Sequence, residues 1–323
     1  MTSEISHNDA SGLFEKSGLF EKSGWLDVGA EVADALAAGR AVVALETTLV
    51  SHGFPGTRGV EVALESERRV RAAGAVPATV AVADGRIRVG IEPALLGRLA
   101  EDPQVRKAGP RDLAAVVAAG GLGSTTVGGT LAVCRLAGIR FMGTGGTGGV
   151  HRGFAATLDI SADLAQMART QAVVVASGPK SLLDVQATSE LLESLAVPVL
   201  GWRTDTLPRF YTADGGPPVS ARVDGVAQAA RIAALHWRLD GGGLLVARPP
   251  RRSLDVDDVT EQAVAAAEQA GVSGQDVTPA VLAHLHEVTN GATLAVNAEL
   301  IADNAGLAAE LAVAYSAIGQ GSR

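Results

Sequence analysis

Two residues of this 323-residue chain, Glu46 and Lys180, could carry out acid–base and nucleophilic chemistry. Glu46 ends the apolar run 41–45, AVVAL, and a carboxyl at the end of such a buried strand is placed for ligand binding and proton transfer. Lys180 follows a second apolar run, and Ser181 and Asp184 behind it match a helix-capping pattern. An amine beside a helix N-terminus meets the positive end of the helix dipole, which favours the neutral, nucleophilic form. A structural ion pair and a solvated lysine remain the alternatives.

Between these residues lies a glycine-rich segment, residues 143–164, GTGGTGGVHRGFAATLDISADL. Glycine allows positive φ angles and a close approach of the backbone to a ligand, so such a loop can present N–H groups to an anion. His151, Arg152, Asp159 and Asp163 could bind phosphate, metal or sugar. The segment formally matches the dinucleotide fingerprint G-x-G-x-x-G. However, no helix is expected directly after its second glycine, so we favour a general anion-binding loop.

Other polar residues near this segment have a ligand-binding and a structural interpretation. Asp163 lies in the first turn of a helix expected at 162–168, where the helix dipole alone favours an acid. Asp159 has no such explanation, and one carboxylate suffices for a hard divalent ion that keeps its waters. Lys107 and Arg111 lie in a basic connector and could bind phosphate or be surface charges.

Apolar periodicity predicts an alternation of strands and helices, and therefore an α/β fold: three α/β/α layers, with a largely parallel or mixed central sheet and helices on both faces. Residues 1–24 carry a tandem SGLFEK repeat and are interpreted as a flexible low-complexity tail. Residues 25–323 are expected to form one catalytic domain with the C-terminal helices packed on it. The expected strands are 41–45, two about the Asp84-Gly85 turn, 138–142, 172–176, 197–202 and 243–247. The expected helices are 28–38, 60–73, 93–99, 112–119, 125–137, 162–168, 181–195, 226–239, 256–270, 279–288 and 294–317.

Composition narrows the classes of partner. A net charge of −8 and an aromatic share of 3% argue against nucleic-acid binding, which needs a basic face and stacking platforms. An anionic small molecule is compatible with this charge, because a few local cations suffice. We expect no membrane span, since no apolar run reaches about 18–20 residues, and a cytoplasmic location. The single cysteine, Cys134, lies in an apolar helical pattern and is expected in the core.

The chain resembles the pseudouridine-5′-phosphate glycosidases, a family that includes indigoidine synthase A-like proteins. Single matching segments are weak signals, but the ordered set is highly specific. The segments are VVALETTLVSHGFP (42–55), GAVPATVAV (74–82), VRKAGPRDL (105–113), GSTTVGGT (123–130), AGIRFMGTGGTGGVHRG (137–153), LDISADL (158–164), SGPKSLLD (177–184) and GGLLVARP (242–249).

The resemblance, rather than spacing, implies a function. The family reversibly cleaves the C–C glycosidic bond of pseudouridine 5′-phosphate to uracil and ribose 5-phosphate, with Mn²⁺ (Mg²⁺ as an alternative), as a cytoplasmic homotrimer. It implies that Glu46 is the acid/base, that Lys180 forms a Schiff base with ring-opened ribose, and that Asp159 binds the metal. The implied substrate-binding residues are Lys107, Val127, Ser161, Ala162, Asp163, Thr144, His151 and Asn297.

This sequence departs from the family pattern at a few positions. Thr47-Thr48 stand where Ser-Thr is commoner, Pro179 replaces a more usual alanine, and FAATL before Asp159 differs at several positions. None of these changes removes a proposed catalytic group, so an active enzyme is expected. The alternatives are another phosphosugar lyase of an indigoidine-type pathway and a non-catalytic phosphosugar-binding protein.

Overall fold

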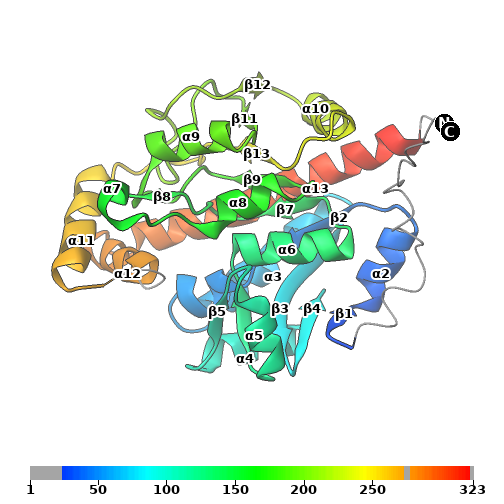
Figure 1. The fold of residues 1–323 in the computed structure, drawn as a ribbon, viewed down its shortest axis with the longest axis horizontal. Helices are drawn as coiled ribbons and strands as arrows, with labels where there is room; N and C mark the ends of the chain where they lie inside the picture. The colour runs from blue at the N-terminus through cyan, green and yellow to red at the C-terminus, as the bar shows by residue number, and fades with distance from the viewer. Residues whose placement is uncertain (1–23, 273–276, 321–323) are drawn as a thin grey trace, which may run out of the picture.

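The computed structural model describes residues 24–272 and 277–320 and has a mixed β-sheet at its centre (Figure 1). Apart from Gly24, the tail predicted at 1–24 lies outside the described residues. The sheet has eleven strands, of which nine run in the order β1-β4-β3-β2-β7-β9-β13-β11-β12. Its strands are β1 (Leu26–Val28), β2 (Val42–Leu45), β3 (Val76–Ala83), β4 (Arg86–Val89), β5 (Arg106–Ala108), β6 (Gly123–Thr125), β7 (Phe141–Gly143), β9 (Val173–Ala176), β11 (Val199–Trp202), β12 (Ala221–Val223) and β13 (Leu244–Ala247).

Most neighbouring strands are parallel, and the antiparallel pairs are β3 with β4 and β3 with β6. The β3–β4 pair is the predicted hairpin at Asp84-Gly85, where both turn residues have positive φ. Strands β8 (Val150–His151) and β10 (Leu183–Asp184) form a separate antiparallel pair. The carboxyl ends of β2, β7 and β9, which are parallel neighbours, therefore lie at one edge of the sheet.

Helices cover both faces of the sheet, as the α/β/α prediction requires. In β2, Val42 and Ala44 pack with α2, α5, α6, α8 and α9 on one face. Val43 and Leu45 pack with α3, α10 and α13 on the other. The helices are α2 (Ala30–Ala37), the π-helical η2 (Leu49–Gly53), α3 (Arg58–Ala72), α4 (Pro93–Glu101), α5 (Leu113–Ala118), α6 (Val127–Ala137), α7 (Phe154–Thr157), α8 (Ala162–Ala168), α9 (Val185–Ser194), α10 (Val226–Arg238), α11 (Asp257–Gln269), α12 (Val277–Val288) and α13 (Ala292–Gln320).

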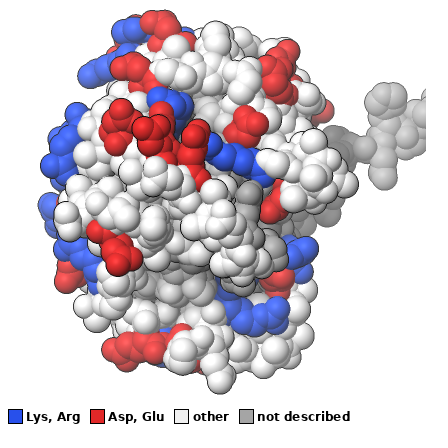
Figure 2. Space-filling view, turned by 90° about the vertical axis from the view of Figure 1, so that its left-hand side faces the viewer, with Lys and Arg blue, Asp and Glu red and all other residues white. Residues whose placement is uncertain are grey.

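Helices α11 and α12 form a projection at one end of the molecule, beside α7 and β8, while α13 runs along the sheet (Figure 1). Viewed from that end, acidic and basic side chains are interspersed on the surface (Figure 2). In the part of the chain that the structure describes, no helix is long and apolar enough to cross a membrane.

Sequence reasoning missed or misplaced several elements. Strands β1, β5 and β12 have three residues each and contain charged side chains, so they lack the apolar run that reveals a buried strand. The helix predicted at 125–137 begins at Val127, and its N-cap is Thr126, because Ser124 belongs to β6. Cys134 is fully buried as predicted, and burial raises the pKa of its thiol to about 12.

Candidate active site

One cavity brings together five of the residues that the sequence singled out. Its wall contains residues that follow β2 and β7, one residue of β5, the loop after β9 and part of α13. These strand ends lie next to one another in the sheet, which explains how residues so distant in sequence meet. The five predicted residues are Glu46, Lys107, Thr144, Lys180 and Asn297.

Glu46 is held in a fixed orientation at the end of β2. Its side chain is buried, with 5% of its surface exposed. The hydroxyls of Thr48 and Thr144 donate hydrogen bonds to its two carboxylate oxygens, one to each. The π-helical turn η2 follows at once, and such turns are frequent at functional sites. A buried carboxyl that opens into a cavity suits proton transfer to a bound molecule.

Lys180 reaches the same cavity from the loop after β9, but its position differs from the prediction. The helix expected from Ser181 begins at Val185, because Asp184 is the N-cap and accepts a hydrogen bond from the Ala187 N–H (2.9 Å). Residues 183–184 belong to β10 instead. Residues 181–184 therefore separate Lys180 from α9, and the helix dipole does not explain the chemistry of Lys180.

The loop of Lys180 is tied to the glycine-rich segment. The backbone N–H of Lys180 donates a hydrogen bond to the Thr147 carbonyl (3.1 Å), and the Thr147 N–H donates one to the Gly178 carbonyl (3.1 Å). Thr147 and Pro179 form an isolated parallel bridge. The strand end that carries Lys180 and the one that carries Thr144 thus form one rigid wall of the cavity.

Asn297 contributes an amide from α13. Only 5% of its surface is exposed, and its Oδ1 is buried without a hydrogen-bond partner among the described residues. Buried polar atoms are normally paired, so an unpaired acceptor in a cavity wall indicates a place for a ligand donor.

A second cavity of about 500 Å³ adjoins the α11–α12 projection and contains four further residues that the sequence singled out: Arg111, His151, Arg152 and Asp159. His151 Nδ1 lies 3.8 Å from Asp159 Oδ2. Burial lowers the pKa of His151, and the charges of Lys107 and Lys180 lower it further, against the opposing effect of Asp159. The two lysines of the first cavity are therefore close enough to act on His151, and the two cavities belong to one region.

Four predicted residues line neither of these cavities: Val127, Ser161, Ala162 and Asp163. The Asp163 carboxylate accepts hydrogen bonds from the N–H groups of Gly128 (2.7 Å) and Gly148 (2.8 Å). Ser161 is the N-cap of α8, because its hydroxyl accepts a hydrogen bond from the Asp163 N–H (3.2 Å). In this structure Asp163 joins α6 and α8 to the glycine-rich loop.

The glycines of 143–149 serve packing rather than unusual backbone angles. All seven residues are described, and none of their glycines has a positive φ. A methyl group at Gly143 would lie 2.7 Å from Ala305 Cα, and one at Gly146, Gly148 or Gly149 would lie under 3.0 Å from a neighbouring side chain. The loop therefore lies directly against α13, Phe210 and α8. No helix follows it directly, so the dinucleotide interpretation fails for the reason anticipated.

Sequence reasoning gave no role to several residues at the site. Thr48 binds Glu46, Phe210 packs on the glycine loop, and Asn304 is bonded to that loop's backbone. Thr48 sits two residues after Glu46 and could have been found from that spacing. Phe210 and Asn304 come from segments without any local signal.

Known proteins match nearly the whole chain. The family model for indigoidine synthase A like protein matches residues 31–314. The chain belongs to this family. The pseudouridine-5′-phosphate glycosidase of Sorangium cellulosum is 44% identical over 304 residues, which cover 92% of this chain and 96% of the relative. That of Salinispora tropica is 48% identical over 296 residues, covering 90% and 91%.

Two solved structures share the fold. The prealnumycin C-glycosynthase AlnA, solved in complex with ribulose 5-phosphate, has a TM-score of 0.85 and 39% identity, with 93% of this chain and 100% of that chain covered. An indigoidine synthase A-like protein of Thermotoga maritima has a TM-score of 0.82 and 34% identity, with 90% and 97% covered. These matches confirm the predicted family and fold class.

Proposed function

We propose that this protein cleaves the C–C glycosidic bond of pseudouridine 5′-phosphate reversibly, giving uracil and ribose 5-phosphate. The arrangement of the catalytic groups carries the proposal. Glu46 and Lys180 line one cavity, and Lys107 and Asn297 line the same cavity. Relatives with 44–48% identity over about nine-tenths of the chain are glycosidases of this name, which supports the same substrate.

The residues of the cavity match the steps that this reaction requires. Lys180 Nζ attacks C1′, the C1′–O4′ bond of the ribose ring breaks, and O4′ takes up the proton that the amine loses. Glu46 protonates C5 of uracil, the C1′–C5 bond breaks with its electron pair passing to the uracil ring, and the nitrogen lone pair forms the C1′=N iminium. Water then hydrolyses the iminium, which releases ribose 5-phosphate and restores the Lys180 amine.

Cations near the cavity suit an anionic substrate. Lys107 and Lys180 both act electrostatically on His151, so positive charge is concentrated between the two cavities. A phosphate bound here would gain from both charges. We assign Lys107 and His151 to phosphosugar binding. The Oδ1 atom of Asn297 would accept a hydrogen bond from a donor group of the substrate.

A divalent ion, Mn²⁺ or Mg²⁺, fits beside Asp159. Among the described residues, no group of three or more His, Cys, Asp or Glu side chains is placed to share a metal. A hard ion that keeps most of its waters needs only one or two carboxylates, and Asp159, partly exposed in the larger cavity, offers one. The ion would supply positive charge that orients the anionic substrate, and chelation should abolish activity while the melting temperature changes little.

We also propose that the protein is a cytoplasmic homotrimer. Two large apolar side chains beside the larger cavity, Leu158 and Ile160, are 73% and 39% exposed, which supports association at this face. Sedimentation equilibrium measures the assembly directly, and a monomer at micromolar concentration would contradict it.

The decisive experiment measures uracil release from pseudouridine 5′-phosphate with Mn²⁺. Lys180→Ala should reduce kcat by at least about a thousandfold, since no other nucleophile replaces the amine. Borohydride with ribose 5-phosphate should label Lys180 in the wild type. Lys180→Arg is the matched control, because it keeps the charge and removes the nucleophile. Full activity in either variant would exclude the covalent mechanism.

A second candidate, C-glycoside formation on a larger aromatic acceptor, has one observation in its favour. The larger cavity has an apolar wall of Leu182, Val264, Ala267, Val272 and Val277, which a bulkier ring than uracil would fill. Incubating the enzyme with ribose 5-phosphate and either uracil or a polycyclic phenol discriminates the two. Faster coupling of the phenol would favour this candidate.

A further inference from the structure

A buried side chain of the C-terminal helix, Asn304, joins the two strand ends of the candidate active site. It has no exposed surface. Its Nδ2 donates to the carbonyls of Thr144 (2.9 Å) and Gly145 (3.4 Å) and to Ser177 Oγ (3.1 Å). Thr144 follows β7 and Ser177 follows β9, so one amide group bonds to the ends of two neighbouring parallel strands.

Both strand ends lead directly to proposed catalytic groups. Thr144 donates its hydroxyl hydrogen to the Glu46 carboxylate. Ser177 opens the loop to Lys180, and its N–H donates to the Gly145 carbonyl (2.8 Å). Further along, the Lys180 N–H bonds to the Thr147 carbonyl (3.1 Å). Asn304 therefore lies at the base of a set of hydrogen bonds that ends at Lys180 on one side and Glu46 on the other.

The chemistry of the amide explains why asparagine stands here. Two of its partners are carbonyls, which only accept, so the NH₂ end must face them. Its Oδ1 is buried without a hydrogen-bond partner among the described residues, and this burial is unfavourable. The hydrogen bonds that the NH₂ group of Asn304 makes must offset that unfavourable burial.

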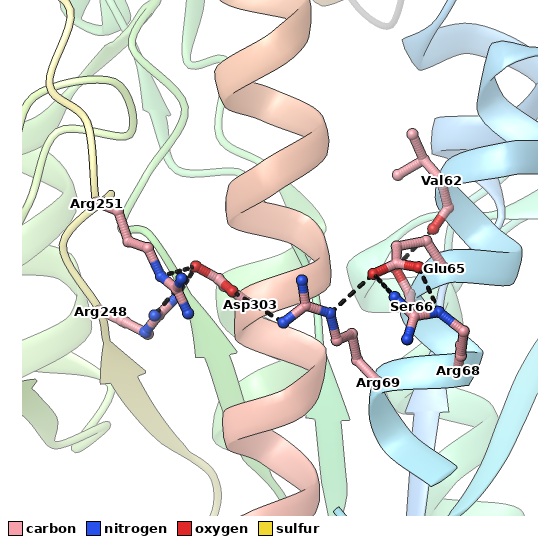
Figure 3. Close-up of polar contacts among 8 residues, drawn as sticks. All are labelled: Val62, Glu65, Ser66, Arg68, Arg69, Arg248, Arg251 and Asp303. Carbon is pink, nitrogen blue, oxygen red and sulfur yellow. Dashed lines mark hydrogen bonds and ion pairs between the residues drawn. The ribbon is translucent and has the colours of Figure 1, made fainter. Parts of the chain in front are cut away.

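The helix that carries Asn304 is also fixed through the neighbouring residue. The preceding residue, Asp303, accepts from Arg251 Nε (2.6 Å) and pairs with Arg248 Nη1 (3.1 Å) and more distantly with Arg69 Nη1 (3.7 Å). Figure 3 shows these three arginines converging on Asp303 from α3 and from the segment after β13. Because the Asp303 ion pairs anchor α13 at this turn, the Asn304 amide is presented in a defined position.

We infer that Asn304 is a positioning residue for the reaction, which orients Glu46 through Thr144 and couples that group to the Lys180 loop. The inference rests on the proposed glycosidase function and adds to it a residue that touches neither substrate nor reacting atoms. The carboxyl and the amine must act on the same C1′–C5 bond, and a common tie at their base preserves their relative placement.

Asn304→Leu tests this inference, because leucine keeps the volume of the side chain and removes the donor. We expect kcat for uracil release to fall about ten- to thirtyfold, equivalent to one or two lost hydrogen bonds, while KM changes less than about threefold. The matched control is Thr293→Val, a buried polar residue of the same helix whose hydroxyl contacts His286 and Thr289 instead. This control should keep wild-type kcat.

Coupling to Thr144 separates positioning from a general loss of stability. In the double variant Thr144→Val with Asn304→Leu, the second change should reduce kcat by less than about threefold, because the route through Thr144 is already broken. Independent, multiplicative effects or a wild-type kcat in Asn304→Leu would overturn the inference. If Asn304→Leu does not fold, Asn304→Ala replaces it, since alanine also removes the donor and places no bulky apolar group against the carbonyls.

Hydrogen exchange decides the inference without turnover. The amides of Thr147 and Lys180 should exchange faster in the Asn304 variant than in Thr293→Val, and unchanged protection would contradict the tie. An inactive wild type would refute the proposed function, whereas an active wild type with unchanged exchange in the variant would refute only the role of Asn304.

Discussion

Individual polar residues in this protein divide into those that face a cavity and those whose hydrogen-bonding groups are occupied by other parts of the protein. Glu46 and Asp163 are both 5% exposed carboxyl groups. Glu46 accepts from two hydroxyls beside a cavity, whereas Asp163 accepts from two backbone N–H groups away from both cavities. Both side chains are carboxylic acids with the same exposed fraction, so the hydrogen-bond partners and the cavity distinguish a reactive acid from a structural one.

Asp163→Ala should lower the free energy of unfolding by about 2–4 kcal/mol, since it leaves the Gly128 and Gly148 N–H groups unpaired and removes an anion from the N-terminus of α6. Asp163→Asn keeps an acceptor and should cost less. Urea denaturation measures both changes. A loss of substrate affinity at unchanged stability would instead support the substrate-binding role implied by the family resemblance.

Glu67 on α3 supplies a pH prediction. Burial raises its pKa, against the smaller lowering effects of the Thr79 hydroxyl and Arg71. The folded state therefore binds this proton more tightly than the unfolded state, and its stability falls as the pH rises from the unfolded pKa through the folded pKa. Glu67→Gln should be more stable than wild type at pH 8, and the difference should vanish below pH 4. A constant difference across a series of urea melts would contradict this assignment.

Loops and helices set how closely the residues of the site can approach one another. The glycine-rich loop touches α13, Phe210, α8 and α9 without room for a Cβ atom at any of the five glycines of residues 143–149. The sequence indicated a general anion-binding loop, and in the structure these glycines pack the backbone of the loop against neighbouring elements. The glycines of residues 143–149 therefore reflect close packing, and none of them has a positive φ.

Gly148→Ala tests that interpretation. The added methyl group would collide with Ser161 and with the Asp163 carboxylate, so we expect a loss of about 3 kcal/mol in stability and a fall in activity. Gly97→Ala is the control, because this glycine of α4 has open space around it and ordinary φ. Alanine there should stabilise the protein by about 0.5–1 kcal/mol. Equal effects in thermal melts of both variants would refute the packing argument.

At the scale of the whole molecule, α13 holds the two halves of the sheet and the site together. It packs on the face that carries β2, β7 and β9, between α3 and α10. Near its end Tyr315 meets Phe141 and Trp237, with ring centroids 5.5 and 5.1 Å away, and its hydroxyl accepts from Arg140 Nη1 (2.6 Å). The same helix carries Asn297 to the cavity and Asn304 to the strand ends behind it.

Tyr315→Ala should therefore destabilise the protein by about 2–3 kcal/mol, through lost aromatic contacts and a vacated space. Tyr315→Phe should cost about 1 kcal/mol or less, since it loses only the hydrogen bond. Chemical denaturation compares the two, and similar losses in both variants would show that the hydroxyl, rather than the ring, fastens the helix.

The sequence by itself determined the α/β class, the covered sheet, the β3–β4 hairpin and the residues of interest. Buried strands of four apolar residues, helical periodicity and the turn at Asp84-Gly85 are local signals, and they survive in the fold. Short strands with charged residues and the true start of α9 were lost, because β1, β5 and β12 are specified by neighbouring strands rather than by their own composition. Glu46 and Lys180 were identified from their positions after apolar runs and from the family resemblance.

Only the tertiary structure decided which of the singled-out residues share a cavity. Parallel pairing of β2, β7 and β9 brings Glu46, Thr144 and Lys180 to one edge of the sheet, although Glu46 and Lys180 lie 134 positions apart in the sequence. The tertiary structure also directs the Asp163 carboxylate to the backbone N–H groups of Gly128 and Gly148. It brings Asn304 of the last helix against the loops that follow β7 and β9. Such contacts depend on strand order and helix placement, which are set by non-local burial and hydrogen bonding, and no local sequence pattern records them.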